Sequence, residues 1–262
     1  METITTRRNP LVARFRDVAL GGEDDSLLLD GVHLVGDALA AGVRITQVIA
    51  ASEALDHPEI RAILSALGRD VSVAAATSMV MDAVSPVRSA SLIVAIADRP
   101  AADSGRLYAA ADPLVVIATD VQDPGNLGAI VRVAEAGGAS GFVAAGQSAN
   151  PFAWKALRGS MGSALRLPIA IHRDTAAAIA EARHHGCRVV ATVPRDGVTH
   201  VDADLRGPLA LLVGGEGRGL PPDLIDGADA RIAIPMQAPV ESLNAAVAAA
   251  ILVYEARRQR HL

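Results

Sequence analysis

The stretch Ile234-Pro235-Met236-Gln237-Ala238-Pro239-Val240-Glu241-Ser242-Leu243-Asn244 organises the second half of the chain, and it runs directly into the segment 245–260. A short apolar strand is predicted to stop at Pro235, because proline cannot donate to a sheet ladder. A loop broken by a second proline follows. Ser242 or Asn244 is then expected to cap a helix, since either side-chain oxygen can accept a free backbone N–H of the first turn.

The segment 245–260 predicts a terminal helix with two different sides. Apolar side chains recur at helical spacing on one side, which we predict to be buried: Leu243, Val247, Ile251 and Tyr254. Small side chains occupy the other side and would let a second backbone pass close by: Ala245, Ala246, Ala248 and Ala249. Capped terminal helices are common, so this block alone does not indicate a function.

The composition describes a chain of 262 residues with a net charge of −5, of which 51% are hydrophobic and 2% aromatic. The length fits two domains, whose cores must be built from Ala, Val, Leu and Ile. Lys155 is the only lysine, so any contact with a nucleic acid must use local clusters of arginine. Cys187 is the only cysteine and the seven histidines are scattered. We therefore expect neither a disulfide nor a metal site.

Neither terminal region carries the pattern of a membrane segment. Residues 1–10 are polar and contain no apolar signal core. The late apolar run 245–254 is too short to span a bilayer. The sequence therefore predicts a cytoplasmic protein with no membrane partner.

Strand and helix patterns alternate along both halves, which predicts an α/β fold. In the first half, strands are predicted at 27–29, 47–51, 71–74 and 92–97. In the second half, they are predicted at 114–118, 141–144, 167–171, 188–193, 209–213 and 231–234. The continuous apolar runs of the second half predict a mostly parallel sheet with helices on its faces. The segment 98–113 is rich in Ala, Asp, Pro and Gly, so we divide the chain into domains 1–105 and 106–262.

Two glycine-containing motifs follow predicted strands of the second half. The first, Asp123-Pro124-Gly125-Asn126-Leu127-Gly128-Ala129-Ile130-Val131-Arg132, opens a helix with Asn126 at a plausible cap. Its spacing matches neither a dinucleotide loop nor a P-loop. Arg132 is either a surface arginine with a buried stem or a functional cation.

The second motif, Leu212-Val213-Gly214-Gly215-Glu216-Gly217-Arg218-Gly219-Leu220, permits tight turns or close contact with a flat ligand. Its Glu216 either anchors the loop or contacts that ligand.

A cluster of arginines lies near the start of the chain, in a segment that predicts a helix from about Pro10. One interpretation is a solvated helix face, and the other is an edge that grips phosphates. The residues proposed for RNA binding are Arg7, Arg8, Arg14 and Arg16.

Three motifs occur in a fixed order: Asn126-x-Gly128-x-x-x-Arg132, Gly214-x-Glu216-x-x-Gly219-Leu220 and Ile234-Pro235-Met236-(x)5-Ser242-Leu243-Asn244. Together they resemble the motifs of the SpoU-type (TrmH-like) RNA 2′-O-ribose methyltransferases of the SPOUT superfamily, over about residues 114–260. Ser160-Met161-Gly162 also looks like the Ser-x-Gly of that family. Leu28-Leu29-Asp30-Gly31 resembles a part of the family's small RNA-binding domain, which has a ribosomal-protein-like α/β fold.

This resemblance implies methyl transfer from S-adenosylmethionine to a ribose 2′-hydroxyl of structured RNA, with ribosomal RNA ahead of transfer RNA. It also implies a homodimer and a deep trefoil knot in the C-terminal SPOUT domain, although knots are rare among folds. The catalytic residues implied are Arg132, Asn126, Ser242 and Asn244, with Glu216 in support. The residues implied to enclose the methyl donor are Thr192, Gly214, Gly215, Gly219, Leu220, Ile234, Met236 and Leu243.

The chain departs from the family pattern at Ala238, where glycine is usual, and at Ala245-Ala246, where Val-Ser is usual. A catalytically silent RNA-binding module of the same fold is therefore an alternative. A nucleotide-dependent oxidoreductase is a further alternative, but the chain lacks a G-x-G-x-x-G loop. Titration with S-adenosylmethionine would separate these classes.

Overall fold

The chain forms two compact units in a computed structural model that describes residues 2–101 and 104–260. The first unit combines Met1–Ala101 with Phe152–Arg166, and the second combines Ala102–Pro151 with Leu167–Leu262. The two units differ from the division predicted at about residue 105 in one respect. The segment 152–166 follows that boundary in the sequence but packs with the first unit. Residues 102 and 103 of the predicted linker lie outside the described residues.

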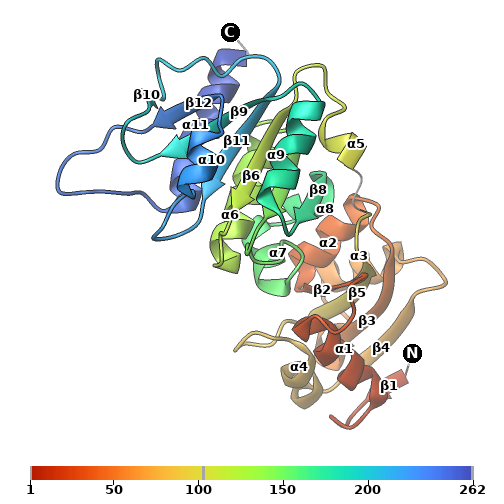
Figure 1. Cartoon of the computed structure of the whole chain (residues 1–262). Coiled ribbons are helices and arrows are strands. Elements are labelled where there is room, and N and C mark those ends of the chain that lie inside the picture. The colour runs from red at the N-terminus through yellow and green to blue at the C-terminus, as the bar shows by residue number, and fades with distance from the viewer. Residues whose placement is uncertain (1, 102–103, 261–262) are drawn as a thin grey trace. The chain divides into compact units, whose positions relative to one another are not determined.

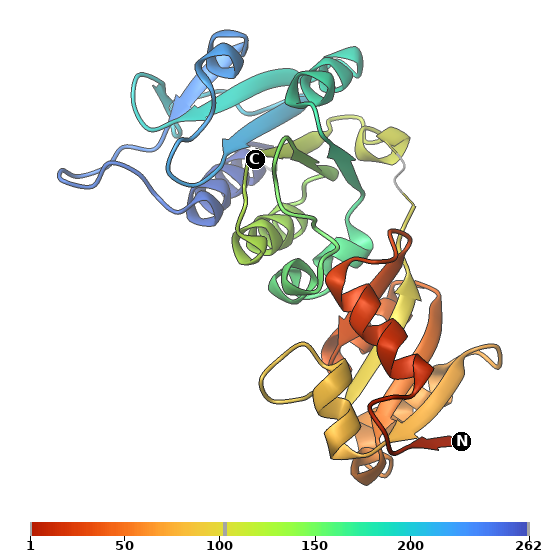
Figure 2. The same ribbon diagram turned by 60° about the horizontal axis from the view of Figure 1, so that its bottom comes forward.

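The first unit is built on a five-stranded sheet in the order β1-β4-β3-β5-β2. Its elements are β1 (Glu2–Ile4), α1 (Pro10–Leu20), β2 (Ser26–Asp30), α2 (Val32–Ala40), β3 (Ile45–Ala51), the 3-10 helix Ser52–Ala54, α3 (Pro58–Ala66), β4 (Ser72–Ala76), α4 (Ser78–Val84), β5 (Ile93–Asp98), α7 (Trp154–Ser160) and α8 (Ser163–Arg166). Strands β1, β4 and β3 are parallel, whereas β5 is antiparallel to both of its neighbours. Figure 2 shows α1 lying over this sheet, with α4 beside it.

Asp30, at the end of β2, fixes the segment 152–166 in the first unit. Its side chain is only 1% exposed. Arg158 Nη1 donates to Asp30 Oδ2 over 3.1 Å, and Ser85 Oγ donates to Asp30 Oδ1 over 2.8 Å. A buried carboxylate is tolerated only when its charge and its lone pairs are matched. These contacts therefore hold α7 against β2, although the two elements are far apart in the sequence.

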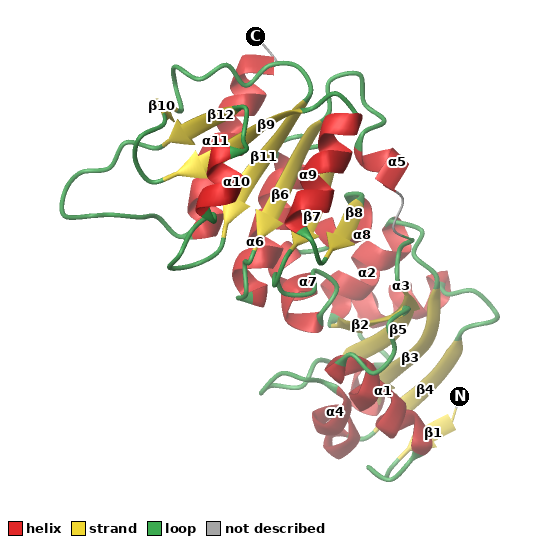
Figure 3. Ribbon diagram, viewed as in Figure 1, coloured by secondary structure: helices red, strands yellow, loops and turns green. Residues whose placement is uncertain are grey.

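The second unit is a seven-stranded sheet in the order β10-β12-β9-β11-β6-β7-β8, shown in Figures 1 and 3. Its elements are α5 (Ser104–Leu107), β6 (Leu114–Thr119), α6 (Pro124–Ala136), β7 (Gly141–Ala145), β8 (Ile169–His172), α9 (Thr175–His184), β9 (Arg188–Val193), β10 (Val198–Thr199), β11 (Leu209–Gly214), α10 (Pro222–Asp226), β12 (Ala230–Ala233) and α11 (Ala245–Arg260). Every pair of neighbouring strands is parallel. The predicted α/β fold with a mostly parallel sheet is therefore confirmed.

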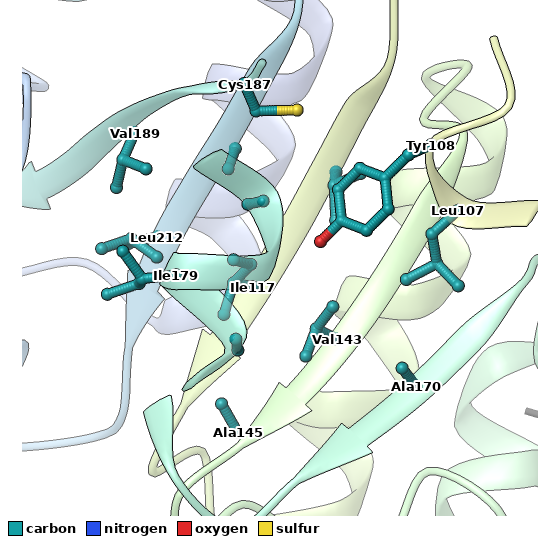
Figure 4. Packing of buried hydrophobic residues seen from close by; sticks show 14 of the residues in the cluster. Leu107, Tyr108, Ile117, Val143, Ala145, Ala170, Ile179, Cys187, Val189 and Leu212 are labelled. Carbon is teal, nitrogen blue, oxygen red and sulfur yellow. The ribbon is translucent and has the colours of Figure 1, made fainter. Parts of the chain in front are cut away.

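One face of this sheet packs its apolar side chains against α9 in a core almost free of aromatic residues (Figure 4). Ile117 of β6 and Ile179 of α9 belong to this cluster. Tyr108 joins it from the predicted linker, which therefore contributes to the core, and its ring stacks on His185 with centroids 4.3 Å apart. Burial raises the pKa of the Tyr108 phenol and of the Cys187 thiol above their ordinary values. Cys187 is thus a free thiol buried in this core.

The buried side of α11 is the reverse of the predicted one. The residues that pack inward are Ala245, Ala249, Leu252, Val253 and Ala256. In contrast, the side chains of Val247 and Tyr254 are 48% and 50% exposed. Helix α11 packs so closely on α6 that a Cβ built on Gly137 would lie 2.2 Å from Val253 Cγ1. The glycine makes room for Val253, and the alanines on the same side of α11 let the two helices pack closely, so this side faces the core while Val247 and Tyr254 are exposed.

The structure adds short elements that the sequence pattern does not predict, namely β1, α4, α5, α8 and β10. The longest of them has seven residues, which is too short for a periodic pattern to stand out. Within residues 2–101 and 104–260, none of the helices is long and apolar enough to cross a membrane.

The substitution Asp30→Asn is expected to destabilise the first unit by about 1–3 kcal/mol, because Arg158 and Ser85 lose a charged acceptor. Urea unfolding followed by the fluorescence of Trp154, the single tryptophan, measures this change within the unit that contains α7. Asp82→Asn is the matched control, since Asp82 is an exposed acidic residue of α4. Equal unfolding midpoints for the two variants would contradict the role assigned to Asp30.

Candidate active site

A cavity of about 820 Å³ opens at the carboxyl ends of the neighbouring strands β12, β9 and β11. The carboxyl edge of a parallel sheet is where ligands bind in α/β folds. The floor of the cavity is apolar and includes Val213, Ile232 and Leu252. Its walls come from the end of β9, from the glycine turn 214–220 and from the segment 241–245. The cavity therefore combines an apolar base with loops rich in backbone polar groups.

The glycine turn 214–220 is pressed against neighbouring backbone at its start. A Cβ on Gly215 would lie 1.9 Å from the carbonyl oxygen of Asp120, and one on Gly214 would lie 2.5 Å from the carbonyl carbon of Gly219. The turn closes on itself, because Gly219 N donates to Gly215 O over 3.2 Å. Glycine is thus required at 214 and 215 for close approach, and these positions fix the wall of the cavity.

The N-terminus of α6 is capped by Asp123 and not by Asn126, which corrects the expectation from the sequence. Asp123 Oδ1 accepts a hydrogen bond from Asn126 N over 2.7 Å. A carboxylate at this position also matches the positive end of the helix dipole. Because Asp123 is the cap, the side-chain amide of Asn126 is free to bond elsewhere.

Asn126 joins three segments through its side-chain amide. Asn126 Nδ2 donates to Glu216 Oε1 over 2.7 Å, and Asn126 Oδ1 accepts from Asn244 Nδ2 over 2.9 Å. Glu216 Oε2 also accepts from Gln122 N over 3.3 Å. Asn244 Oδ1 caps α11, accepting from Ala246 N over 2.9 Å. The first turn of α6, the glycine turn and the start of α11 are therefore linked by side-chain hydrogen bonds.

All eight residues predicted to enclose a donor line the cavity: Thr192, Gly214, Gly215, Gly219, Leu220, Ile234, Met236 and Leu243. Of the predicted catalytic residues, Glu216, Ser242 and Asn244 line it as well, and Asn126 contacts two of these three. Arg132 does not line it. It is exposed on α6 and makes no hydrogen bond or ion pair within the described part of the chain.

The sequence did not single out Arg195, Arg218 and Glu241, which also line the cavity. Arg195 Nη2 lies 3.5 Å from Glu241 Oε1, and both side chains are largely exposed. Arg218 is exposed within the glycine turn. Its position between Gly217 and Gly219 was visible in the sequence, but nothing in a glycine-rich run says which way a single charged side chain points.

The four arginines proposed for RNA binding, in α1 and the segment before it, are only partly available for a ligand. Arg14 forms two hydrogen bonds of 2.9 Å with Glu23, which lower the pKa of that carboxyl to about 2. Arg7 Nε donates to the carbonyl oxygen of Met79 over 3.0 Å. The side chains of Arg8 and Arg16 are exposed and form no hydrogen bond or ion pair with another described residue. Arg14 is therefore a structural arginine, and Arg8 and Arg16 are the better candidates for a phosphate contact.

Among residues 2–101 and 104–260, no group of three or more His, Cys, Asp or Glu side chains is arranged to hold a metal ion. The expectation that the protein works without a metal stays a prediction.

Sequence comparison gives the first link to known proteins. A profile of the SpoU rRNA Methylase family matches residues 113–254. The 23S rRNA (guanosine(2553)-2′-O)-methyltransferase RlmP of Bacillus subtilis (strain 168) is 30% identical over 233 residues, which cover 89% of each protein. An uncharacterized tRNA/rRNA methyltransferase of Synechocystis is 29% identical over 98% of this chain and 94% of its own length.

Solved structures give the second link. The AdoMet-bound rRNA methyltransferase from Sinorhizobium meliloti is 31% identical, with a TM-score of 0.88 over 100% of this chain and 98% of that chain. The SpoU methyltransferase AviRb from Streptomyces viridochromogenes, in complex with AdoMet, is 27% identical. Its TM-score is 0.87 over 96% of this chain and 98% of that chain.

The substitution Asn126→Ala is expected to loosen both the glycine turn and the start of α11, because Glu216 and Asn244 lose a shared partner. Hydrogen exchange should then be faster at the amides of 214–220 and 244–248 than in the wild type, while α9 stays protected. Gln122→Ala is the matched control, since Gln122 contacts Glu216 through its backbone N–H alone. Unchanged exchange in both loops would refute the linking role of Asn126.

Proposed function

Because this chain belongs to the SpoU rRNA methylase family, we propose that it transfers a methyl group from S-adenosylmethionine to a ribose 2′-hydroxyl of ribosomal RNA. The supporting observation is the cavity at the strand ends, which brings residues of all three sequence motifs within one hydrogen-bonded arrangement. Ribosomal RNA is favoured over transfer RNA, because the Bacillus subtilis and Sinorhizobium meliloti relatives are both rRNA methyltransferases by name. An rRNA substrate would place the protein in the cytoplasm.

The residues of the cavity fit this donor. The adenine ring of S-adenosylmethionine is flat and apolar on both faces. Such a ring suits the apolar part of the cavity lining, which includes Val213, Ile232 and Leu252. The donor's polar edges need backbone partners at close range. Gly214 and Gly215 line the cavity and carry no side chain, so their backbone groups can face a ligand directly. When bound, S-adenosylmethionine supplies a methyl group that is already activated on a sulfonium.

The protein's own task is then to place the ribose oxygen in line with that methyl group and to let its proton leave. We assign Arg132 to the ribose and its phosphate, because it is an unpaired cation on α6 nearly two turns beyond Asn126. A guanidinium does not lose its proton in proteins, so we assign it hydrogen-bond donation and charge stabilisation rather than base catalysis. Ser242 and Asn244, at the mouth of the cavity, would orient the same ribose. The proton would leave to water or to a phosphate oxygen.

The proposal includes the two features that the family resemblance implies for the assembly. One is a trefoil knot formed by the C-terminal segments, which is supported by the contribution of 214–220 and 241–245 to a single cavity. The other is a homodimer. The exposed apolar stripe of α11, with Val247 48% and Tyr254 50% exposed, supports a face that a second copy would cover. Light scattering on the purified protein would test the dimer.

The function is tested with purified protein, tritiated S-adenosylmethionine and unmodified transcripts of 23S rRNA and of tRNA. We expect label in the 23S rRNA, at a nucleotide whose linkage then resists alkaline hydrolysis, and we expect the rate to be unchanged by EDTA. Label only in tRNA would overturn the choice of RNA. Donor binding without any transfer would favour the silent RNA-binding module.

The substitution Gly215→Ala is expected to weaken S-adenosylmethionine binding by at least about tenfold, which corresponds to about 1.4 kcal/mol. The added Cβ would start 1.9 Å from the Asp120 carbonyl oxygen, so the wall of the cavity must move. Isothermal titration measures the change. Gly36→Ala is the control, because Gly36 lies in α2 away from the cavity lining, its φ is not positive and its Cβ would meet no atom within 4 Å. Equal affinities for wild type and Gly215→Ala would show that this wall does not hold the donor.

The substitution Arg132→Ala is expected to lower the single-turnover methylation rate by about 10²–10³, with little change in donor affinity. Arg132→Lys should restore little of the rate, because an ammonium cannot reproduce the planar pair of donors. Since Arg132 acts by positioning, the pH dependence of the wild-type rate should persist in both variants at a lower level. Near-normal turnover in Arg132→Ala would remove the catalytic assignment.

A further inference from the structure

The charged side chains that line the cavity are Arg195, Glu216, Arg218 and Glu241. Three of them have partners. The Glu216 carboxylate accepts from Asn126 and from Gln122 N, and Arg195 faces Glu241 at 3.5 Å. Within the described part of the chain, Arg218 forms no hydrogen bond, ion pair or ring contact. Among the described residues, Arg218 is therefore the one cavity-lining guanidinium that is not paired with a carboxylate.

Arg218 is exposed, and the glycines on either side of it leave room around the turn. Gly217 and Gly219, on either side of Arg218, have positive φ values of +86° and +64°. A Cβ built on either glycine would meet no atom within 4 Å, which means that open space surrounds this half of the turn. The other half is different, because Gly214 and Gly215 are pressed against backbone. The turn is thus anchored at its start, and Arg218 is exposed in its less crowded half.

The charge of the donor makes an anion the fitting partner for Arg218. S-adenosylmethionine carries a sulfonium, an ammonium and a carboxylate, and its net charge is therefore positive. The two carboxylates that line the cavity are engaged elsewhere, Glu216 by Asn126 and Glu241 by Arg195, so an anion for Arg218 would come from a ligand. Guanidinium groups bind phosphate through two parallel hydrogen bonds, which is the strongest match for such a side chain.

We propose that Arg218 binds a phosphate of the RNA strand whose ribose is presented at the cavity. This inference rests on the proposed function, since it takes RNA as the substrate. It gives Arg218 a role different from that of Arg132. Arg132 is assigned to the reacting ribose, whereas Arg218 is a binding residue that holds the strand and contributes little to the chemical step.

The test compares full-length wild type with Arg218→Ala, Arg218→Lys and the control Arg173→Ala. Arg173 is an exposed arginine between β8 and α9, with no hydrogen bond or ion pair among the described residues, and it does not line the cavity. An unmodified 23S rRNA transcript is titrated at several salt concentrations. In Arg218→Ala, the slope of log affinity against log salt should fall by about 0.7–0.9, the value for one phosphate contact. The KM for this RNA should rise several-fold while kcat changes little.

Arg218→Lys should keep most of the salt slope, since an ammonium preserves the charge, and Arg173→Ala should match the wild type. S-adenosylmethionine affinity, measured by titration, should be unchanged in all variants. Arg218→Ala behaving like Arg173→Ala would overturn the inference. So would a loss of donor affinity with an unchanged salt slope, which would assign Arg218 to the donor carboxylate. If the wild type binds this RNA with the expected slope change but never methylates it, the proposed function fails and the phosphate contact stands.

Discussion

The hydrogen bonds of the Asn126 side chain are the interaction on which the candidate site depends. Its Oδ1 accepts a hydrogen bond from Asn244 Nδ2 over 2.9 Å, and its Nδ2 donates one to Glu216 Oε1 over 2.7 Å. It thereby sets the first turn of α6, the glycine turn and the start of α11 relative to one another. An amide can do this because it is both donor and acceptor in one rigid plane. The negative charge of Glu216 strengthens its bond, since hydrogen bonds to ionised groups are stronger than neutral ones.

The parallel sheet provides the frame for this arrangement, and small residues provide its precision. The carboxyl ends of β12, β9 and β11 place three loops around one cavity. Glycine then allows close approach, of backbone to backbone at Gly215 against Asp120 and of the Val253 side chain to backbone at Gly137. A core with few aromatic side chains suits such packing, because small side chains let the backbones lie close together and no large side chains are needed to fill the space between them.

Much of the fold and of the site could be predicted from the sequence, and the misses have physical causes. Six of the seven strands of the second unit were predicted because each contains an apolar run, whereas the two-residue strand β10 was too short to show one. The motif order indicated which residues gather at the cavity. The periodicity of the larger apolar residues did not show which side of α11 is buried. The buried side is rich in alanine, whose small side chain allows close packing but gives only a weak apolar signal. Spacing could not distinguish Asp123 from Asn126 as the cap. The contact between Asp30 and Arg158 joins residues 128 apart, which no local pattern reveals.

The most direct test of the central claim maps ribose methylation across the ribosomal and transfer RNA of the source organism. Cells that lack this protein are compared with cells that carry the wild type or the Arg132→Ala variant. The account predicts that one 2′-O-methyl group of 23S rRNA is present only with the wild type. An unchanged rRNA pattern in cells that lack the protein, or a methyl group lost from tRNA alone, would contradict the account.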